Sequence, residues 1–159
     1  MGLFVKLCVA GFCAYVYDVH IRRIQAFTEA RSLKAQSGKP ILNVGCGTSG
    51  SALFGSTTQG DVNVDIEAPD RTRRLAQGTV GFGDAQDLRL WPDKYFSVCV
   101  ASHILEHLPD PDRALAEWHR VADRVIVLTP VWYDPACWLH PGHRWYYPDG
   151  PYGRKTPLY

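Results

Sequence analysis

The sequence lacks an excess of charge of either sign. Its 159 residues carry 17 Lys and Arg against 16 Asp and Glu, so the formal net charge is only +1. Because proteins that bind nucleic acid contact phosphates through clustered positive charge, this balance gives no electrostatic footprint for such a partner. We therefore expect no nucleic-acid partner.

The cysteines do not form the even, regularly spaced set that a disulfide framework requires. There are five, scattered along the chain and mostly in apolar surroundings: Cys8, Cys13, Cys46, Cys99 and Cys137. An odd number of isolated cysteines is typical of reduced core residues. We expect a reducing compartment and a cytoplasmic location.

A hydrophobic run long enough to cross a bilayer is also missing. Residues 3–17 are apolar apart from Lys6, which is shorter than the ~20 residues that a spanning helix needs. No small-residue cleavage site of a secretory signal follows. Apolar positions at helical spacing predict a helix over residues 3–24, and two interpretations remain open. In the first, the helix packs on the rest of the protein or in a homo-oligomer. In the second, it lies on a membrane surface with His20, Arg22 and Arg23 at the headgroups.

No internal repeat suggests a second folding unit. A length of 159 residues and a hydrophobic content of 46% suit one domain with one core. Three segments are expected: an apolar N-terminal helix or extension over 1–36, a core over 37–130, and a C-terminal cap over 131–159 that is rich in aromatic residues and proline. Ser37-Gly38-Lys39-Pro40 is the stop-and-turn signal before the core.

A glycine-rich loop follows the first strand-like run, residues 41–44. It has the pattern G-x-G-x-x-G at Gly45, Gly47 and Gly50, which lets a ligand approach the backbone closely. The pattern is weak evidence by itself, because a glycine turn can be purely structural. Asp65 ends the next strand-like run, and 65 − 45 = 20 is the spacing at which an acid reaches a ribose hydroxyl in nucleotide-binding βαβ units. A ribose-bearing ligand is therefore the leading hypothesis.

Five strands are expected, alternating with helical segments. The strands are 41–44, 61–65, 79–83, 96–101 and 124–129, with a helix that Asp110 and Pro111 open. At most one or two helical turns fit at 51–54, and a short helix is plausible over 71–77. This order predicts an α/β fold with an open, mostly parallel, Rossmann-like sheet and helices on both faces. Ligands of such sheets bind beyond the carboxyl ends of the strands, where the sequence has Gly45, Asp65, Asp84, Ser102 and His103.

Four motifs in this order resemble the class I S-adenosylmethionine-dependent methyltransferases, especially the small-molecule branch of methyltransferase type 11. They are L-N-V-G-C-G at 42–47, V-D-I at 64–66, G-D-A at 83–85, and S-H-I-L-E-H-L-P-D-P at 102–111. The resemblance covers roughly residues 40–130. It implies transfer of a methyl group from S-adenosylmethionine to a small-molecule or surface-glycan-type acceptor.

The resemblance also implies a cofactor site. Gly45 and Gly47 would line the methionine end, Asp65 would accept the ribose hydroxyls, and Asp84 would accept the adenine amino group. The complete expected set is Gly45, Cys46, Gly47, Asp65, Ile66, Asp84, Ala85 and Ser102. The chain departs from the family at Asn43, where many relatives carry an acid. It also has only 159 − 129 = 30 residues after Thr129, so we expect an abbreviated sheet edge at the C-terminal end.

His103 is the candidate catalytic residue, as a general base or an acceptor contact. The alternative is a histidine that packs beneath the cofactor. The residues expected to contact the acceptor or form a lid are His107, Trp132, His143 and Trp145, because aromatic faces attract a sulfonium and stack on planar or sugar-like groups. These aromatics equally suit a cap over the sheet edge.

A metal site is not expected. Cys137, His140 and His143 have ligand-like spacing, but no fourth ligand lies within sequence reach and a proline interrupts the run. Two other functions stay open. A nicotinamide-dependent oxidoreductase would share the glycine turn and Asp65, and a regulatory subunit that has lost catalysis would act through a partner.

Overall fold

The computed structural model describes residues 2, 9–13, 17–47, 59–66, 78–132, 135–153 and 155–158. Gly50, the expected helical turns at 51–54 and the expected helix at 71–77 lie outside these residues. Among the described residues, no helix has both the length and the apolar character needed to cross a membrane.

The described residues from 9 to 37 are helical, and those within the predicted 3–24 helix agree with that prediction. Residues 9–13 are helical, a π-helical turn η1 (Tyr17–Ile21) follows, and it leads into α2 (Arg22–Ser37). The helix ends at Gly38, which has φ of 73° and donates its N–H to the Lys34 carbonyl. Glycine is the residue that adopts this left-handed conformation at low cost. The stop signal read from the sequence therefore ends the helix.

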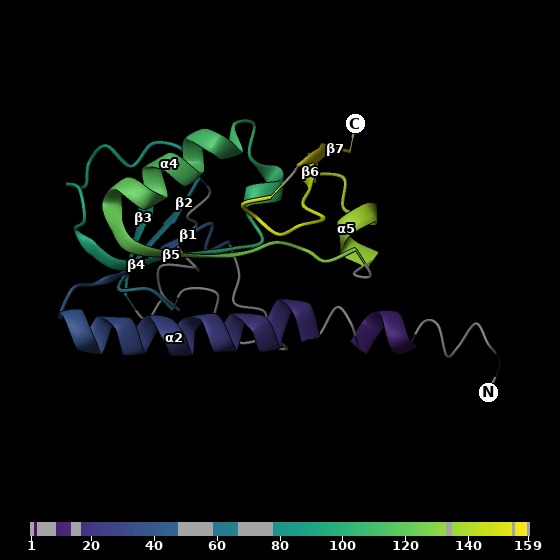
Figure 1. Cartoon of the computed structure of the whole chain (residues 1–159), viewed down its shortest axis with the longest axis horizontal. Helices are drawn as coiled ribbons and strands as arrows, with labels where there is room; N and C mark the ends of the chain where they lie inside the picture. Colours follow the sequence, from purple (N-terminus) through teal and green to yellow (C-terminus); the bar gives the residue numbers. More distant parts are fainter. Residues whose placement is uncertain are drawn as a thin grey trace.

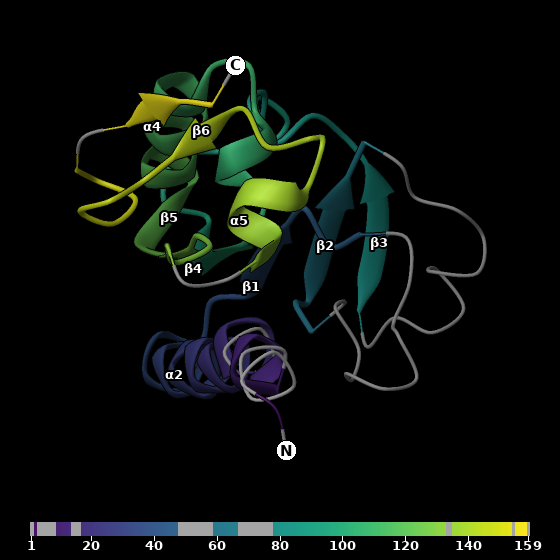
Figure 2. The ribbon, with the colours of Figure 1, turned by 90° about the vertical axis from the view of Figure 1, so that its right-hand side faces the viewer.

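Five parallel strands form the central sheet. They are β1 (Ile41–Val44), β2 (Val62–Asp65), β3 (Thr79–Phe82), β4 (Phe96–Ser102) and β5 (Ala122–Leu128). The strand order is β3-β2-β1-β4-β5, and Figure 2 shows β2 and β3 beside β1. The predicted open parallel sheet is confirmed. The chain order reverses between β1 and β4, which is where such sheets bind ligands.

Two layers of helix cover the sheet. The helix α4 (Pro111–Val121) lies on one face and α2 on the other (Figure 1). On the α2 face, Phe27 and Ala30 pack with Val98 and Val100 of β4. On the α4 face, Trp118 and Val121 belong to the larger core cluster. All seven residues of β4 are buried, as expected of a strand covered on both faces.

The C-terminal segment lies at the end of the sheet where the chain leaves β5 (Figure 1). It contains α5 (Pro135–Leu139), β6 (Trp145–Tyr146) and β7 (Thr156–Pro157). The last two strands pair antiparallel in a small separate sheet. Among the described residues, β5 is therefore the edge of the main sheet, in agreement with the abbreviated edge expected from the sequence.

Candidate active site

The carboxyl ends of the strands form one wall of a cavity of about 520 Å³. The register brings them level, since Val44 of β1 pairs with Val64 of β2 and with Ala101 of β4. Eight residues singled out in the sequence line this cavity: Gly45, Gly47, Asp65, Ile66, Asp84, Ala85, His103 and His107. The sequence motifs, together with the family resemblance, therefore identified most of the lining.

The glycine loop turns sharply after β1. Gly45 has φ of 67° and Gly47 has φ of 69°, a conformation that side chains with a Cβ disfavour. A Cβ on Gly45 would lie 2.4 Å from Cδ1 of Ile104, whereas a Cβ on Gly47 would meet nothing within 4 Å. The Gly47 N–H donates to Oδ2 of Asp65 at 2.7 Å. The loop is thus held against the carboxylate that ends β2.

Asp84 is held by its neighbour Gln86. The Gln86 backbone N–H and side-chain amide both donate to Asp84 Oδ1, at 2.8 and 3.2 Å. The Gln86 Oε1 in turn accepts the Asp110 N–H at 2.9 Å, at the N-terminus of α4. The carbonyl of Ala85 accepts the indole N–H of the fully buried Trp118 at 2.8 Å. Two residues of the α4 region, Asp110 and Trp118, therefore hold the 84–86 turn in place.

His103 occupies a strained position at the end of β4. Its φ of 55° is in the left-handed region, which is uncommon for a residue other than glycine. Its backbone N–H donates to the Leu128 carbonyl at 2.8 Å. Its Nδ1 lies 3.6 Å from Oε1 of Glu106, which is in the short helical turn η2 (Leu105–His107). Strain of this kind is often kept at functional sites.

A second hollow of about 410 Å³ adjoins the cavity, since Pro109 lines both. His143 and Trp145, two of the residues expected to contact the acceptor, are in its wall. The indole N–H of Trp145 donates to the Leu108 carbonyl at 2.9 Å. Burial lowers the pKa of His143, although its ring also bonds the Cys137 carbonyl and faces Glu106. At neutral pH this imidazole is uncharged.

Three of the predicted site residues lie elsewhere. Cys46 is buried below the loop, and burial, followed by the charge of Asp65, raises the pKa of its thiol to about 12. Ser102 is buried and accepts from Nε of Arg23 at 3.1 Å. Trp132 is exposed and lines a separate hollow of about 140 Å³ next to Arg22. None of these three is among the residues that line the 520 Å³ cavity.

Other lining residues were not singled out from the sequence as site residues. They are Gly83, Gln86, Ile104, Leu108 and Pro109. Each of them is close in sequence to Asp84, His103 or another motif residue, and this proximity could have predicted that they line the cavity. Glu106, which is part of the 102–111 motif, was not among the expected site residues. It is fully buried, and neither of its carboxylate oxygens has a hydrogen-bond partner among the described residues.

These residues fit a nucleoside-type cofactor. A volume of about 520 Å³ is within the usual range of small-molecule pockets. The open space beside Gly47 is one that a Cβ would enter. Carboxylates accept hydrogen bonds from hydroxyl and amino groups, and Asp65 and Asp84 both line the wall. The donors and acceptors of the cavity thus match a ribose and an exocyclic amine.

Comparison with known proteins gives a family. A model of the family described as "Methyltransferase domain" matches residues 42–124, just over half of the chain. A curated relative, the ubiquinone biosynthesis O-methyltransferase of Pseudomonas syringae pv. tomato, is 31% identical over 117 residues. The match covers 67% of this chain and 48% of the relative. The chain therefore spans about half the length of that curated protein.

Solved structures with a similar arrangement include two of interest. A SAM-dependent methyltransferase of Thermotoga maritima, titled a possible histamine N-methyltransferase, has 19% identity and a TM-score of 0.43. That match covers 72% of this chain and 60% of the other. The 4+2 cyclase SpnF has 26% identity and a TM-score of 0.38, and the match covers 61% of this chain and 41% of the cyclase.

Proposed function

Because the chain belongs to the methyltransferase domain family of class I S-adenosylmethionine-dependent enzymes, we propose that it methylates a small-molecule acceptor with S-adenosylmethionine. The observation that carries the proposal is the convergence of Gly47, Asp65 and Asp84 on one cavity at the switch point of the sheet. Family membership also favours a methyl donor over a nicotinamide cofactor.

Each residue of the cavity has a role in this proposal. Asp65 accepts the ribose hydroxyls, beside Ile66, and the hydrogen bond from Gly47 fixes its carboxylate. Asp84, oriented by Gln86, accepts the adenine amino group next to Ala85. The loop of Gly45, Cys46 and Gly47 holds the methionine end, whereas the Ser102 hydroxyl accepts from Arg23 and is not among the residues that line the cavity. When bound, S-adenosylmethionine supplies a methyl group on a positively charged sulfur.

His103 acts as the general base or as an acceptor contact. It lines the cavity from the end of β4, and its ring lies beside the Glu106 carboxylate. An imidazole nitrogen within hydrogen-bond reach of an acceptor hydroxyl or amine can take its proton. Methyl transfer depends mainly on holding donor and nucleophile close and aligned. The strained backbone of His103 is consistent with such positioning.

The acceptor enters through the 410 Å³ hollow beside Pro109. Trp145 and His143 contribute to its wall, and Nζ of Lys155 lies 5.2 Å from the centre of the Trp145 ring. An indole face beside hydrogen-bonding groups suits a sugar-like ring, so a surface glycan is a candidate acceptor class. His107 connects the two spaces, because it lines the larger cavity and its ring lies 4.6 Å from that of His143.

A labelled-methyl transfer assay against pools of phenolic, amine and glycan acceptors tests the proposal. We expect transfer by the full chain, and a loss of roughly 10²-fold or more in His103→Ala if the ring is the base. Exchange of Glu29 for Gln, at an exposed position of α2, should leave the rate unchanged. Cofactor binding without transfer to any pool would favour the regulatory-subunit alternative.

The N-terminal helix is part of the proposal as an attachment surface. Val9, Phe12 and Ile24 are 50%, 62% and 56% exposed, and a row of exposed apolar side chains needs a cover. A membrane surface and a second copy of the chain are the two candidates. Two measurements on the chain with and without residues 1–20 distinguish them. If the helix binds a membrane, the truncated chain should no longer co-sediment with anionic liposomes. If the helix forms a dimer, truncation should reduce the molar mass measured by light scattering in solution from that of a dimer to that of a monomer.

A further inference from the structure

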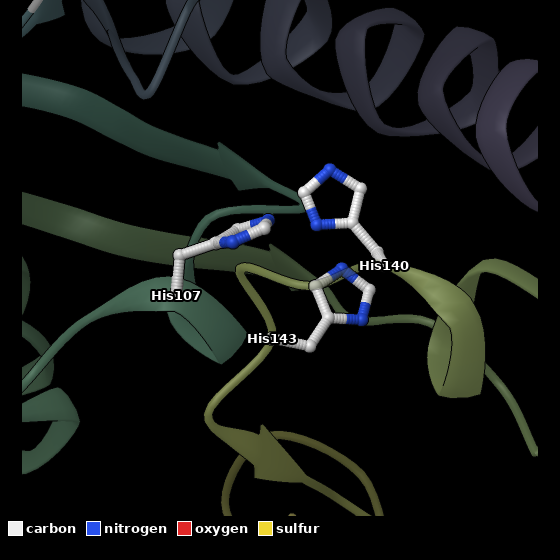
Figure 3. A group of neighbouring side chains, drawn as sticks. All are labelled: His107, His140 and His143. Atoms are coloured by element: carbon white, nitrogen blue, oxygen red, sulfur yellow. The ribbon is translucent and has the colours of Figure 1, made fainter.

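We propose that His107, His140 and His143 bind a divalent transition-metal ion such as Zn²⁺. His107 ends η2, and the other two residues flank the turn at Pro141-Gly142 between α5 and β6. Each ring offers a nitrogen, and these nitrogens lie within 4.8 Å of one another. Figure 3 shows the three rings around a common space. Residues 33 to 36 positions apart in sequence thus meet as one cluster (140 − 107 and 143 − 107).

Two of the rings have the tautomer that a metal ligand requires. Nδ1 of His107 lies 2.9 Å from the Gly142 carbonyl, and Nδ1 of His143 lies 3.2 Å from the Cys137 carbonyl. A carbonyl oxygen only accepts, so each Nδ1 carries the proton and each Nε2 keeps its lone pair. Histidine ligands of metals almost always donate their other N–H in this way. The supporting hydrogen bonds are therefore present.

His140 offers the third lone pair. The Gly142 N–H donates to its Nδ1 at 3.1 Å, so this nitrogen is unprotonated, and a bound ion would replace that hydrogen bond. Zn–N bonds of 2.0–2.1 Å place tetrahedral ligand atoms about 3.4 Å apart, so nitrogens that now lie up to 4.8 Å apart would draw together by up to about 1.4 Å. The exposed position of His140 allows this movement.

The buried carboxylate of Glu106 is an independent observation in favour of a cation here. It is fully buried, its Oε1 lies 3.9 Å from Nε2 of His143, and neither oxygen has a hydrogen-bond partner among the described residues. A carboxyl group without hydrogen bonds is costly to bury. A positive ion on the neighbouring imidazoles would compensate that charge.

The ligand chemistry selects the class of ion. Imidazole suits Zn²⁺, Co²⁺ and Ni²⁺, whereas Mg²⁺ and Ca²⁺ prefer oxygen ligands. Three protein nitrogens leave one tetrahedral position for water. The set differs from the one considered in sequence, because Cys137 contributes its backbone carbonyl to His143 and the fold supplies His107 instead. The bound ion would fasten the C-terminal segment to η2 at the margin of the cavity.

Metal binding can be measured without any methyl transfer. The full chain is stripped with a chelator and titrated with Co²⁺, followed by visible absorption, and then with Zn²⁺ in competition. We expect one Co²⁺ per chain with the intense visible bands of four-coordinate cobalt, displaced by Zn²⁺. His140→Ala and His107→Ala should each weaken binding by at least about tenfold. His140 is exposed, so its substitution should leave the circular dichroism spectrum unchanged.

The matched control is His119→Ala. His119 is an exposed histidine of α4 whose ring lies against Tyr152, and it should leave the affinity unchanged. The absence of stoichiometric Co²⁺ binding would overturn the proposal. So would binding that survives both His140→Ala and His107→Ala, or a cobalt spectrum with thiolate charge-transfer bands, because either result would assign the ion to other ligands.

Discussion

The backbone N–H of Gly47 donates a hydrogen bond of 2.7 Å to Oδ2 of Asp65. It connects the loop after β1 to the end of β2, and both residues line the cavity. The bond helps to orient the carboxylate at the end of this strand. A preoriented acceptor loses less entropy when a ligand binds. The acid that the sequence places 20 residues after Gly45 therefore makes a defined contact with the same loop, through Gly47.

Alanine substitutions in the glycine loop should differ in cost. Gly45→Ala and Gly47→Ala each force a Cβ into a left-handed backbone, at roughly 1–2 kcal/mol of unfolding free energy. Gly45→Ala also drives its Cβ into Ile104, which adds about 1–3 kcal/mol of overpacking. Urea unfolding followed by circular dichroism measures both. Equal losses would contradict the described packing of the loop.

Replacement of Trp118 should affect the cofactor site from a distance. Trp118→Phe removes the donor to the Ala85 carbonyl, so we expect a loss of about 1–3 kcal/mol in stability and weaker cofactor binding. The matched control is Trp138→Phe, which removes an indole hydrogen bond to the Trp132 carbonyl at a half-exposed position. The control should leave cofactor affinity unchanged. Similar affinity losses in both variants would contradict a specific link to Ala85.

The fold and the site differ in how far sequence predicts them. β4 was predictable because a strand buried on both faces is mostly apolar, and α4 because Asp110 and Pro111 mark its start. The cluster of His107, His140 and His143 was not predictable. It depends on a turn that returns the C-terminal segment to η2, and no local periodicity encodes that long-range contact. The burial of the Glu106 carboxylate without a hydrogen bond among the described residues was not predictable for the same reason.

Acid should weaken the contact between α4 and the 84–94 loop. Hydrogen bonds from Arg120 lower the pKa of Glu117 below 4.5, although burial opposes this, and the Leu88 N–H adds a further bond. A lowered folded-state pKa means that the stabilisation is present above the ordinary pKa and is lost as pH falls through the folded value. Glu117→Gln should therefore cost roughly 1–2 kcal/mol at pH 7 and progressively less below pH ~4.

The comparison for this effect is Glu29→Gln, at an exposed position of α2. Denaturant midpoints of both variants are measured between neutral and acidic pH. The denaturant midpoint of the Glu29 variant should equal that of the parent protein at every pH. A Glu117 variant whose deficit is independent of pH would show that its charge is not the source of the stability.

Cys46 should resist alkylation in the folded chain. Burial, together with the charge of Asp65, raises the pKa of its thiol to about 12, so almost no thiolate exists at pH 8. Cys13 is exposed and should react first. Peptide mapping by mass spectrometry after timed iodoacetamide treatment gives the order. Modification of Cys46 as fast as that of Cys13, without denaturant, would contradict the buried loop.

Calorimetric titration with S-adenosylmethionine, and separately with NAD, tests the central claim most directly. We predict saturable binding of one S-adenosylmethionine per chain and no heat with NAD. Asp65→Ala should weaken that binding by about 1–3 kcal/mol through loss of the ribose acceptor, while Asp112→Asn should bind like the parent. Binding of NAD without S-adenosylmethionine, or an unchanged affinity in Asp65→Ala, would contradict the account.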